Sequence, residues 1–183
     1  MKIAYTIAPG RGQTDMLLFE VAEKLALLGF AACGTVQINT DSAEGPCDMD
    51  VTVLPDGPVL RISQNLGAAS KGCRLDPAAL ETAVGLVSAR LDTSPDILIV
   101  NKFGKHEADG RGFRSVIAQA ISLDIPVLVG VNALNIDAFL EFTGPDAQCL
   151  QPDVAEIAQW AGRLLRGKIN QPAPHVTGTL ATA

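Results

Sequence analysis

The alternation of strand-like and helix-like segments constrains the fold of this chain more than any other feature of its sequence. Short runs of Val, Ile, Leu and Ala alternate with segments whose apolar residues recur at helical spacing, almost throughout the chain. Strands that alternate with helices in this way usually form a parallel sheet with crossover helices. The sequence therefore predicts an α/β fold of three layers, with a mainly parallel sheet of about five strands and helices on both faces.

The elements are expected at definite places along the chain. Strands of the parallel sheet are predicted at residues 2–8, 32–38, 97–100, 126–131 and 148–150. Helices are predicted at residues 15–28, 77–91, 112–123 and 136–142, and a last helix begins after Asp153. An inserted β-hairpin is expected from residues 50–54 and 59–63, because Pro55-Asp56-Gly57-Pro58 between them is a turn sequence.

Size and composition predict a single domain without a membrane span. A chain of 183 residues fits one domain, expected over residues 1–167, and residues 168–183 are expected to form a flexible C-terminal tail. No apolar run reaches the ~20 residues that a membrane helix needs, and the first ten residues do not resemble a signal peptide. A cytoplasmic location is therefore expected.

Charge and cysteine spacing narrow the classes of partner. The net charge of −6 argues against nucleic acid and anionic membranes, yet residues 61–114 carry eight basic and six acidic side chains. This locally positive middle favours a small anionic ligand. Cys33, Cys47, Cys73 and Cys149 form no Cys-x-x-Cys pair, so no structural metal site is predicted. Cys73 lies close to two basic residues, which makes it a candidate reactive thiol.

The loop after the first strand partly matches a phosphate-binding loop. In the pattern Gly-x-x-x-x-Gly-Lys-[Ser/Thr], Gly12 takes the second glycine and Thr14 the hydroxyl, but Gln13 replaces the lysine and Ile7 replaces the first glycine. A dinucleotide fingerprint also fails, because Asp15 replaces its third glycine. Three interpretations stay open: a turn that needs glycine, a degenerate phosphate site and a dinucleotide site. The second makes the loop a candidate ligand-binding segment, with residues Gly10, Arg11, Gly12, Gln13 and Thr14.

The loop after the buried strand 97–100 is the second candidate segment. Asn101 takes the place of the carboxylate that reaches the metal in a Walker B motif, and an amide is a poorer Mg²⁺ ligand. Positive charge for an anion is expected from Arg61, Lys71, Arg74, Lys102, Lys105 and Arg111. Glu107 and His106 are the candidate acid and base here. The alternative is a solvated charged loop.

These motifs resemble those of two families. The order of pieces up to about residue 131 is similar to the small P-loop nucleoside-triphosphatases of thermophilic and human cancer-related type. Gly104, Glu107 and Phe113 match that family's pattern, whereas Asn101 and Lys102 replace its acidic pair. The runs 61–64, 72–77, 101–105 and 110–112 more closely resemble a bacterial domain-of-unknown-function family. The resemblance implies that members generally lack an intact P-loop and that some occur beside molybdate-uptake genes.

Together the residues and the resemblance predict binding of a nucleotide or another phosphate-like anion without efficient hydrolysis. The sequence leaves the cofactor open: a nucleotide is one candidate, and Mg²⁺ has weak support because of Asn101. Two alternatives stay open: an enzyme that uses Glu107 or His106 on an anionic substrate, and a regulatory or interaction protein in the metabolism of molybdate or other oxyanions. The sequence predicts no oligomeric state.

Overall fold

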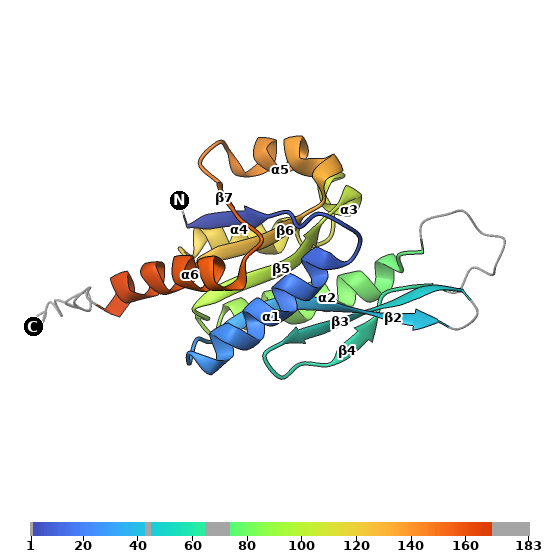
Figure 1. The fold of residues 1–183 in the computed structure, drawn as a ribbon, viewed down its shortest axis with the longest axis horizontal. Coiled ribbons are helices and arrows are strands. Elements are labelled where there is room, and N and C mark those ends of the chain that lie inside the picture. Colours follow the sequence, from blue (N-terminus) through green and yellow to red (C-terminus); the bar gives the residue numbers. More distant parts are fainter. Residues whose placement is uncertain (1, 43–44, 65–73, 170–183) are drawn as a thin grey trace, which may run out of the picture.

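One mixed sheet forms the centre of the computed structural model, which describes residues 2–42, 45–64 and 74–169 (Figure 1). Its strands are β1 (Ile3–Thr6), β2 (Ala32–Ser42), β3 (Gly45–Leu54), β4 (Val59–Arg61), β5 (Ile97–Phe103), β6 (Val127–Val131) and β7 (Gln148–Leu150). The strands lie in the order β4-β3-β2-β5-β6-β1-β7. The pairs β2–β5, β5–β6, β6–β1 and β1–β7 are parallel, whereas β2–β3 and β3–β4 are antiparallel. The predicted α/β fold with a mainly parallel sheet and an inserted hairpin is therefore confirmed.

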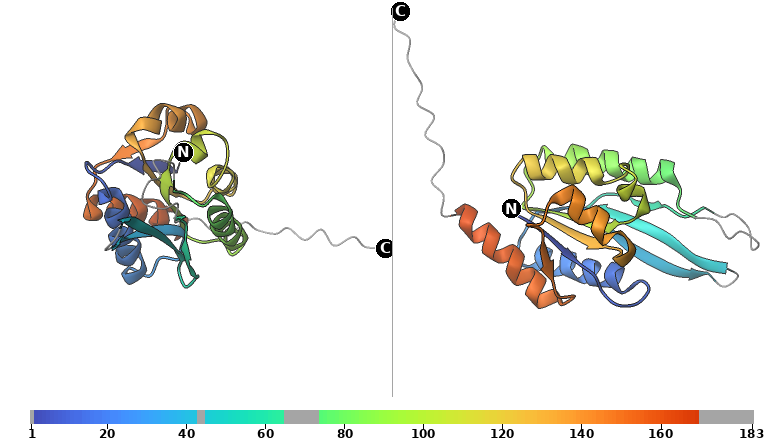
Figure 2. Two further views of the ribbon diagram at one scale, coloured as in Figure 1. Left: turned by 90° about the vertical axis from the view of Figure 1, so that its right-hand side faces the viewer. Right: turned by 90° about the horizontal axis from the view of Figure 1, so that it is seen from above.

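Helices cover both faces of this sheet. They are α1 (Gln13–Leu27), α2 (Pro77–Leu91), α3 (Lys105–Ala108), α4 (Arg114–Ser122), α5 (Ile136–Thr143) and α6 (Val154–Ile169), with a short 3₁₀ turn η1 (Ala133–Asn135). Figure 2 shows α2 and α4 on one face and α1 and α6 on the other. A separate apolar core fills each side. Leu98, Val100 and Val129 face α2 and α4, while Ile97, Ile99 and Leu128 face α1 and α6. Alternate residues of each buried strand thus serve opposite cores.

The antiparallel part of the sheet is larger than the sequence predicts. The expected hairpin is present as the β3–β4 pair, but β2 also continues past residue 38 and pairs with the whole of β3. This pair projects beyond the helices (Figure 1). Residues 39–49 are mostly polar, so they lack the alternation of apolar and polar residues that identifies a strand in a sequence.

Several local features also differ from expectation. β5 runs to Phe103, so Asn101 and Lys102 belong to the strand and not to the loop. The predicted loop of residues 101–111 contains the one-turn helix α3. α1 begins two residues early, at Gln13. α6 ends at Ile169, two residues into the predicted tail, and the rest of that tail lies outside the described residues. Within the part of the chain that the structure describes, no helix is long and apolar enough to cross a membrane.

Candidate functional site

A cavity of about 670 Å³ opens at the carboxyl edge of the sheet, on the face that α2 and α4 cover. Its walls come from the middle of β2, from β3, from the end of β5, from the turn after β6, from α2 and from α3. Volumes between ~300 and 1,000 Å³ are typical of small-molecule sites, and the carboxyl edge of a parallel sheet is where ligands of α/β proteins bind. The cavity is therefore the candidate site.

Four basic side chains line the cavity: Arg11, Arg74, Lys102 and Lys105. Two carboxylates, Glu107 and Asp109, line it as well. Arg74 donates from Nε to the carbonyl of Gln64 at 3.1 Å, and its Nη2 lies 3.6 Å from Oδ1 of Asp48. Lys102 and Lys105 are exposed, and within residues 2–42, 45–64 and 74–169 neither has a carboxylate at ion-pair distance. These two ammonium groups are available to an anion.

The inner wall of the cavity is apolar. Met49, Val51, Ile62, Leu75, Leu80 and Phe113 form it. Val51, Ile62, Leu80 and Phe113 are also buried members of the core under α2 and α4. The wall is thus a continuation of the hydrophobic core, and it offers contact to an apolar part of a ligand.

Beside the cavity, Asp15 accepts hydrogen bonds from three amide side chains. Nδ2 of Asn101 lies 2.8 Å from Oδ1, and Nδ2 of Asn39 and Nε2 of Gln37 lie 2.6 Å and 3.5 Å from Oδ2. The Oδ1 atom of Asn101 accepts from the backbone N–H of Gln37 at 3.0 Å. Asp15 and Asn101 are 8% and 4% exposed, so their polar groups are satisfied by the protein itself. This network ties α1 to β2 and β5.

The sequence alone does not predict that Asp15 accepts these hydrogen bonds. In the sequence, Asp15 stands out only because it replaces the third glycine of a dinucleotide motif. A usable signal was the amide in place of a carboxylate at Asn101, because an amide both donates and accepts and can therefore join a carboxylate to a backbone N–H. The partners Gln37 and Asn39 come from β2, far from both residues in the sequence.

The loop between β1 and α1 contributes little to the cavity. Gly10 and Gly12 have φ of +97° and +77°, which explains the glycines. The Gln13 amide lies over Gly10, where a Cβ would be 3.2 Å from its Cδ and Nε2 atoms. Thr14 Oγ1 accepts from the Ala8 N–H at 3.1 Å. Of the five predicted loop residues, Arg11 lines the cavity.

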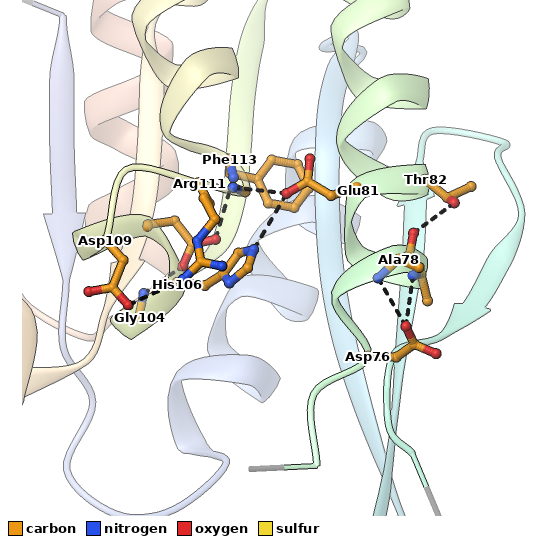
Figure 3. Close-up of polar contacts among 12 residues, drawn as sticks. Asp76, Ala78, Glu81, Thr82, Gly104, His106, Asp109, Arg111 and Phe113 are labelled. Carbon is orange, nitrogen blue, oxygen red and sulfur yellow. Dashed lines mark hydrogen bonds and ion pairs between the residues drawn. The ribbon is translucent and has the colours of Figure 1, made fainter.

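Glu107 and His106 line the cavity but also hold the local backbone together. The carboxylate of Glu107, 4% exposed, accepts from the N–H groups of Gly104 at 2.9 Å and Phe113 at 3.4 Å. Nε2 of His106 lies 3.4 Å from Oε1 of Glu81, and that oxygen also accepts from the Gly112 N–H at 3.1 Å (Figure 3). Both side chains thus fix the segment between β5 and α4, and Glu81 joins it to α2.

Two predicted basic residues do not line the cavity. Arg61, on β4, pairs through Nε with Asp50 at 2.9 Å and through Nη1 with Asp48 at 2.8 Å. The hydrogen bond to Asp50, followed by the charges of Asp48 and Asp50, raises the pKa of the Arg61 guanidinium. Arg111 lies 3.6 Å from the carboxylate of Asp109 and is also absent from the lining (Figure 3).

Lys71 and Cys73 lie outside the described residues. Within residues 2–42, 45–64 and 74–169, no three His, Cys, Asp or Glu side chains are grouped to hold a metal ion.

The α/β fold of this chain is similar to that of two solved nucleoside triphosphatase-type structures. THEP1 of the hyperthermophile Aquifex aeolicus is similar with a TM-score of 0.61 at 17% identity, over 91% of this chain and 98% of THEP1. A human cancer-related nucleoside triphosphatase is similar with a TM-score of 0.62 at 15% identity, over 94% of this chain and 100% of that protein. At such identities the similarity shows a common fold.

The chain belongs to the family described as "Protein of unknown function (DUF2478)", whose model matches residues 3–160. It is also 32% identical over 160 residues to the molybdenum import ATP-binding protein ModC 2 of Bradyrhizobium diazoefficiens. That match covers 87% of this chain but 18% of ModC 2, so the chain spans about a fifth of the length of this relative. Both resemblances expected from the sequence, to a family of unknown function and to the small P-loop nucleoside triphosphatases, are confirmed.

Proposed function

We propose that this protein binds a nucleotide or another phosphate-like anion and does not hydrolyse it efficiently. The observation that carries the proposal is the cavity at the carboxyl edge, which joins basic side chains from separate segments. Arg11 comes from the loop before α1, Arg74 from the segment before α2, and Lys102 and Lys105 from the end of β5 and the start of α3. Side chains that converge from distant parts of a sequence onto one cavity are typical of a binding site.

The groups that hydrolysis of a nucleotide requires do not fit this site. Phosphoryl transfer depends on positive charge that neutralises the transferred group, usually a lysine and a bound Mg²⁺. Gln13 carries no charge, and its amide lies over Gly10. Asn101 accepts from the Gln37 N–H with its oxygen and donates to Asp15 with its nitrogen, and an amide is a poorer Mg²⁺ ligand than a carboxylate. Binding without efficient turnover is therefore the function we favour.

Calorimetric titration tests the proposal. ATP, ADP, GTP, phosphate, sulfate and molybdate are titrated into the wild type and into Lys102→Ala. We expect at least one ligand to bind with micromolar affinity, and Lys102→Ala to weaken binding by about 1–2 kcal/mol at low salt. Lys24→Ala is the control, because Lys24 is an exposed lysine in the last turn of α1 and does not line the cavity. Absence of heat with the whole panel would contradict anion binding.

Similarity to ModC 2 favours a second candidate, a regulatory or interaction protein in the handling of molybdate or other oxyanions. In the same titration, binding of molybdate in preference to every nucleotide of the panel would favour this candidate over nucleotide binding. An enzyme that uses Glu107 or His106 has less support, since both side chains already bond to neighbouring groups. Turnover of phosphate esters that is lost in Glu107→Gln, with the fold intact, would favour the enzyme.

A further inference from the structure

The cavity has two chemically different ends. Its apolar wall comes from β3, from the segment after β4, from α2 and from Phe113. Arg11 comes instead from the loop before α1, and Lys102 and Lys105 come from the end of β5 and the start of α3. In the sheet, β5 is two strands from β3. With neighbouring strands ~4.8 Å apart, the two lysines and the apolar wall from β3 are separated by about 10 Å along the carboxyl edge.

Arg74 is the basic residue at the apolar end. Its Nη2 lies 3.6 Å from Oδ1 of Asp48. Asp48 is on β3, next to Met49 of the apolar wall. A neighbouring carboxylate offsets part of the charge of Arg74. The two lysines, which have no such neighbour among the described residues, therefore mark the end where an anion is held.

The size of the cavity excludes a bare oxyanion as its full occupant. Its volume is about 670 Å³. A tetrahedral oxyanion has five heavy atoms and takes up on the order of 100 Å³, if a water molecule takes ~30 Å³. Such an ion bound at Lys102 and Lys105 leaves the apolar wall in contact with water. A ligand that also covers that wall gains the free energy of removing apolar surface from water.

We infer that the cavity takes an organic anion with a flat apolar body, such as a nucleoside phosphate, in one orientation. This inference rests on the proposed anion binding and specifies its ligand class. The anionic group lies against Lys102, Lys105 and Arg11. The apolar body lies between β3 and α2, against Met49, Leu75 and Leu80. A nucleoside diphosphate is long enough to span both ends.

Variants at the two ends separate the contributions of anion and body. Met49 is half-buried and lines the apolar end, so Met49→Gln changes its polarity with little change in shape. Lys102→Gln removes a charge at the other end. Each variant and the wild type are titrated with four probes: pyrophosphate, ADP, 1-naphthyl phosphate and adenosine. Leu27→Gln is the matched control for the apolar change, since Leu27 is 85% exposed on α1.

The expected pattern has two parts. ADP and 1-naphthyl phosphate bind the wild type about tenfold or more tightly than pyrophosphate, and adenosine binds weakly. Met49→Gln then weakens the two aromatic anions and leaves pyrophosphate unchanged, whereas Lys102→Gln weakens all three anions. Leu75→Gln, read against circular dichroism of the folded state, repeats the test of the apolar wall with a second residue.

Other outcomes overturn the inference in distinguishable ways. If pyrophosphate binds as tightly as ADP and 1-naphthyl phosphate, the apolar wall does not contribute to binding. The inference then fails, while the proposed anion binding still holds. Adenosine that binds as tightly as ADP would remove the role of the lysines. If none of the three anions binds the folded wild type, the proposed anion binding fails, and the inference fails with it.

Discussion

Asp15 and Asn101 share a hydrogen bond of 2.8 Å at a position almost closed to solvent. Asn101→Asp places a second carboxylate beside the first, and two like charges at this distance raise the pKa of the pair. An aspartate with a raised pKa in the folded state destabilises the fold once the pH rises above its unfolded value, ~3.9. We therefore expect Asn101→Asp to lower the free energy of unfolding by about 2–4 kcal/mol at pH 8, and by less at pH 5.

Urea denaturation at the two pH values measures this effect. The control is the exchange Asp15→Asn with Asn101→Asp, which keeps one carboxylate and one amide and should recover most of the loss. A single variant as stable as the wild type at pH 8 would show that the network does not stabilise the fold.

Cys33 and Cys149 are expected to react very differently with thiol reagents. Burial raises the pKa of the Cys33 thiol to about 12, while the charge of Arg90 opposes the shift. The thiolate is the reactive form, so Cys33 stays neutral and unreactive at pH 8, whereas Cys149 is exposed. Iodoacetamide labelling with peptide-level mass spectrometry should modify Cys149 at least ten times faster, roughly the ratio expected from solvent access. Equal rates in the folded protein would contradict the buried position of Cys33.

At the scale of elements, two glycines are expected to respond to alanine in opposite directions. Gly34 on β2 has φ of +120°, and a Cβ there would lie against the Ile99 carbonyl of β5. Gly34→Ala should therefore cost about 2 kcal/mol or more, because neither backbone can move apart without loss of the β2–β5 pairing. Gly85 is exposed within α2 and has nothing within 4 Å of its Cβ position, so Gly85→Ala should stabilise by about 0.5–1 kcal/mol. Chemical denaturation of both variants tests this, and a change of the same sign in both would contradict it.

The elements that sequence reasoning predicts well are those with local signals. α2 is an example: Asp76 accepts from the N–H groups of Ala78 and Ala79, Pro77 occupies the first turn, and Leu80 lies on the buried face. The cap, the proline and the apolar spacing are all visible in the sequence. By contrast, the pairing of β2 with the polar half of β3 depends on contacts between strands, and it leaves no local pattern.

The candidate site shows the same division. Lys102 and Lys105 lie at the carboxyl end of a buried strand, and this end of a strand predicts a site. In the sequence, the charge of Arg61 does not distinguish it from the lysines that line the cavity. Its position on β4, opposite Asp50 in the strand register, decides that its charge is matched on the surface and does not reach the cavity.

At the scale of the whole molecule, the cavity connects parts of the chain that have little else in common. Its walls include Arg11 before α1, Met49 on β3, Leu80 on α2, Lys105 on α3 and Asn132 after β6. A ligand that contacts all of these segments binds only when the whole domain is folded. Such a ligand should stabilise the domain against global unfolding, because it binds the folded state and not the unfolded chain.

The net charge of the chain, −6, opposes an anion at long range, so this stabilisation must come from the local basic groups and should be sensitive to salt. ADP at one hundred times its dissociation constant should raise the free energy of unfolding by about 2.7 kcal/mol. At the same ADP concentration, 0.5 M NaCl should remove much of that increase, because added ions screen the exposed lysines.

The double variant Lys102→Ala, Lys105→Ala tests the two lysines directly. Without ligand, its free energy of unfolding should be within about 0.5 kcal/mol of the wild type, since both side chains are exposed. It should lose most of the stabilisation by ADP. Urea denaturation of the wild type and the double variant, with and without ADP and at low and high salt, measures these free energies of unfolding. A double variant that ADP stabilises as much as the wild type would show that these lysines do not hold the anion.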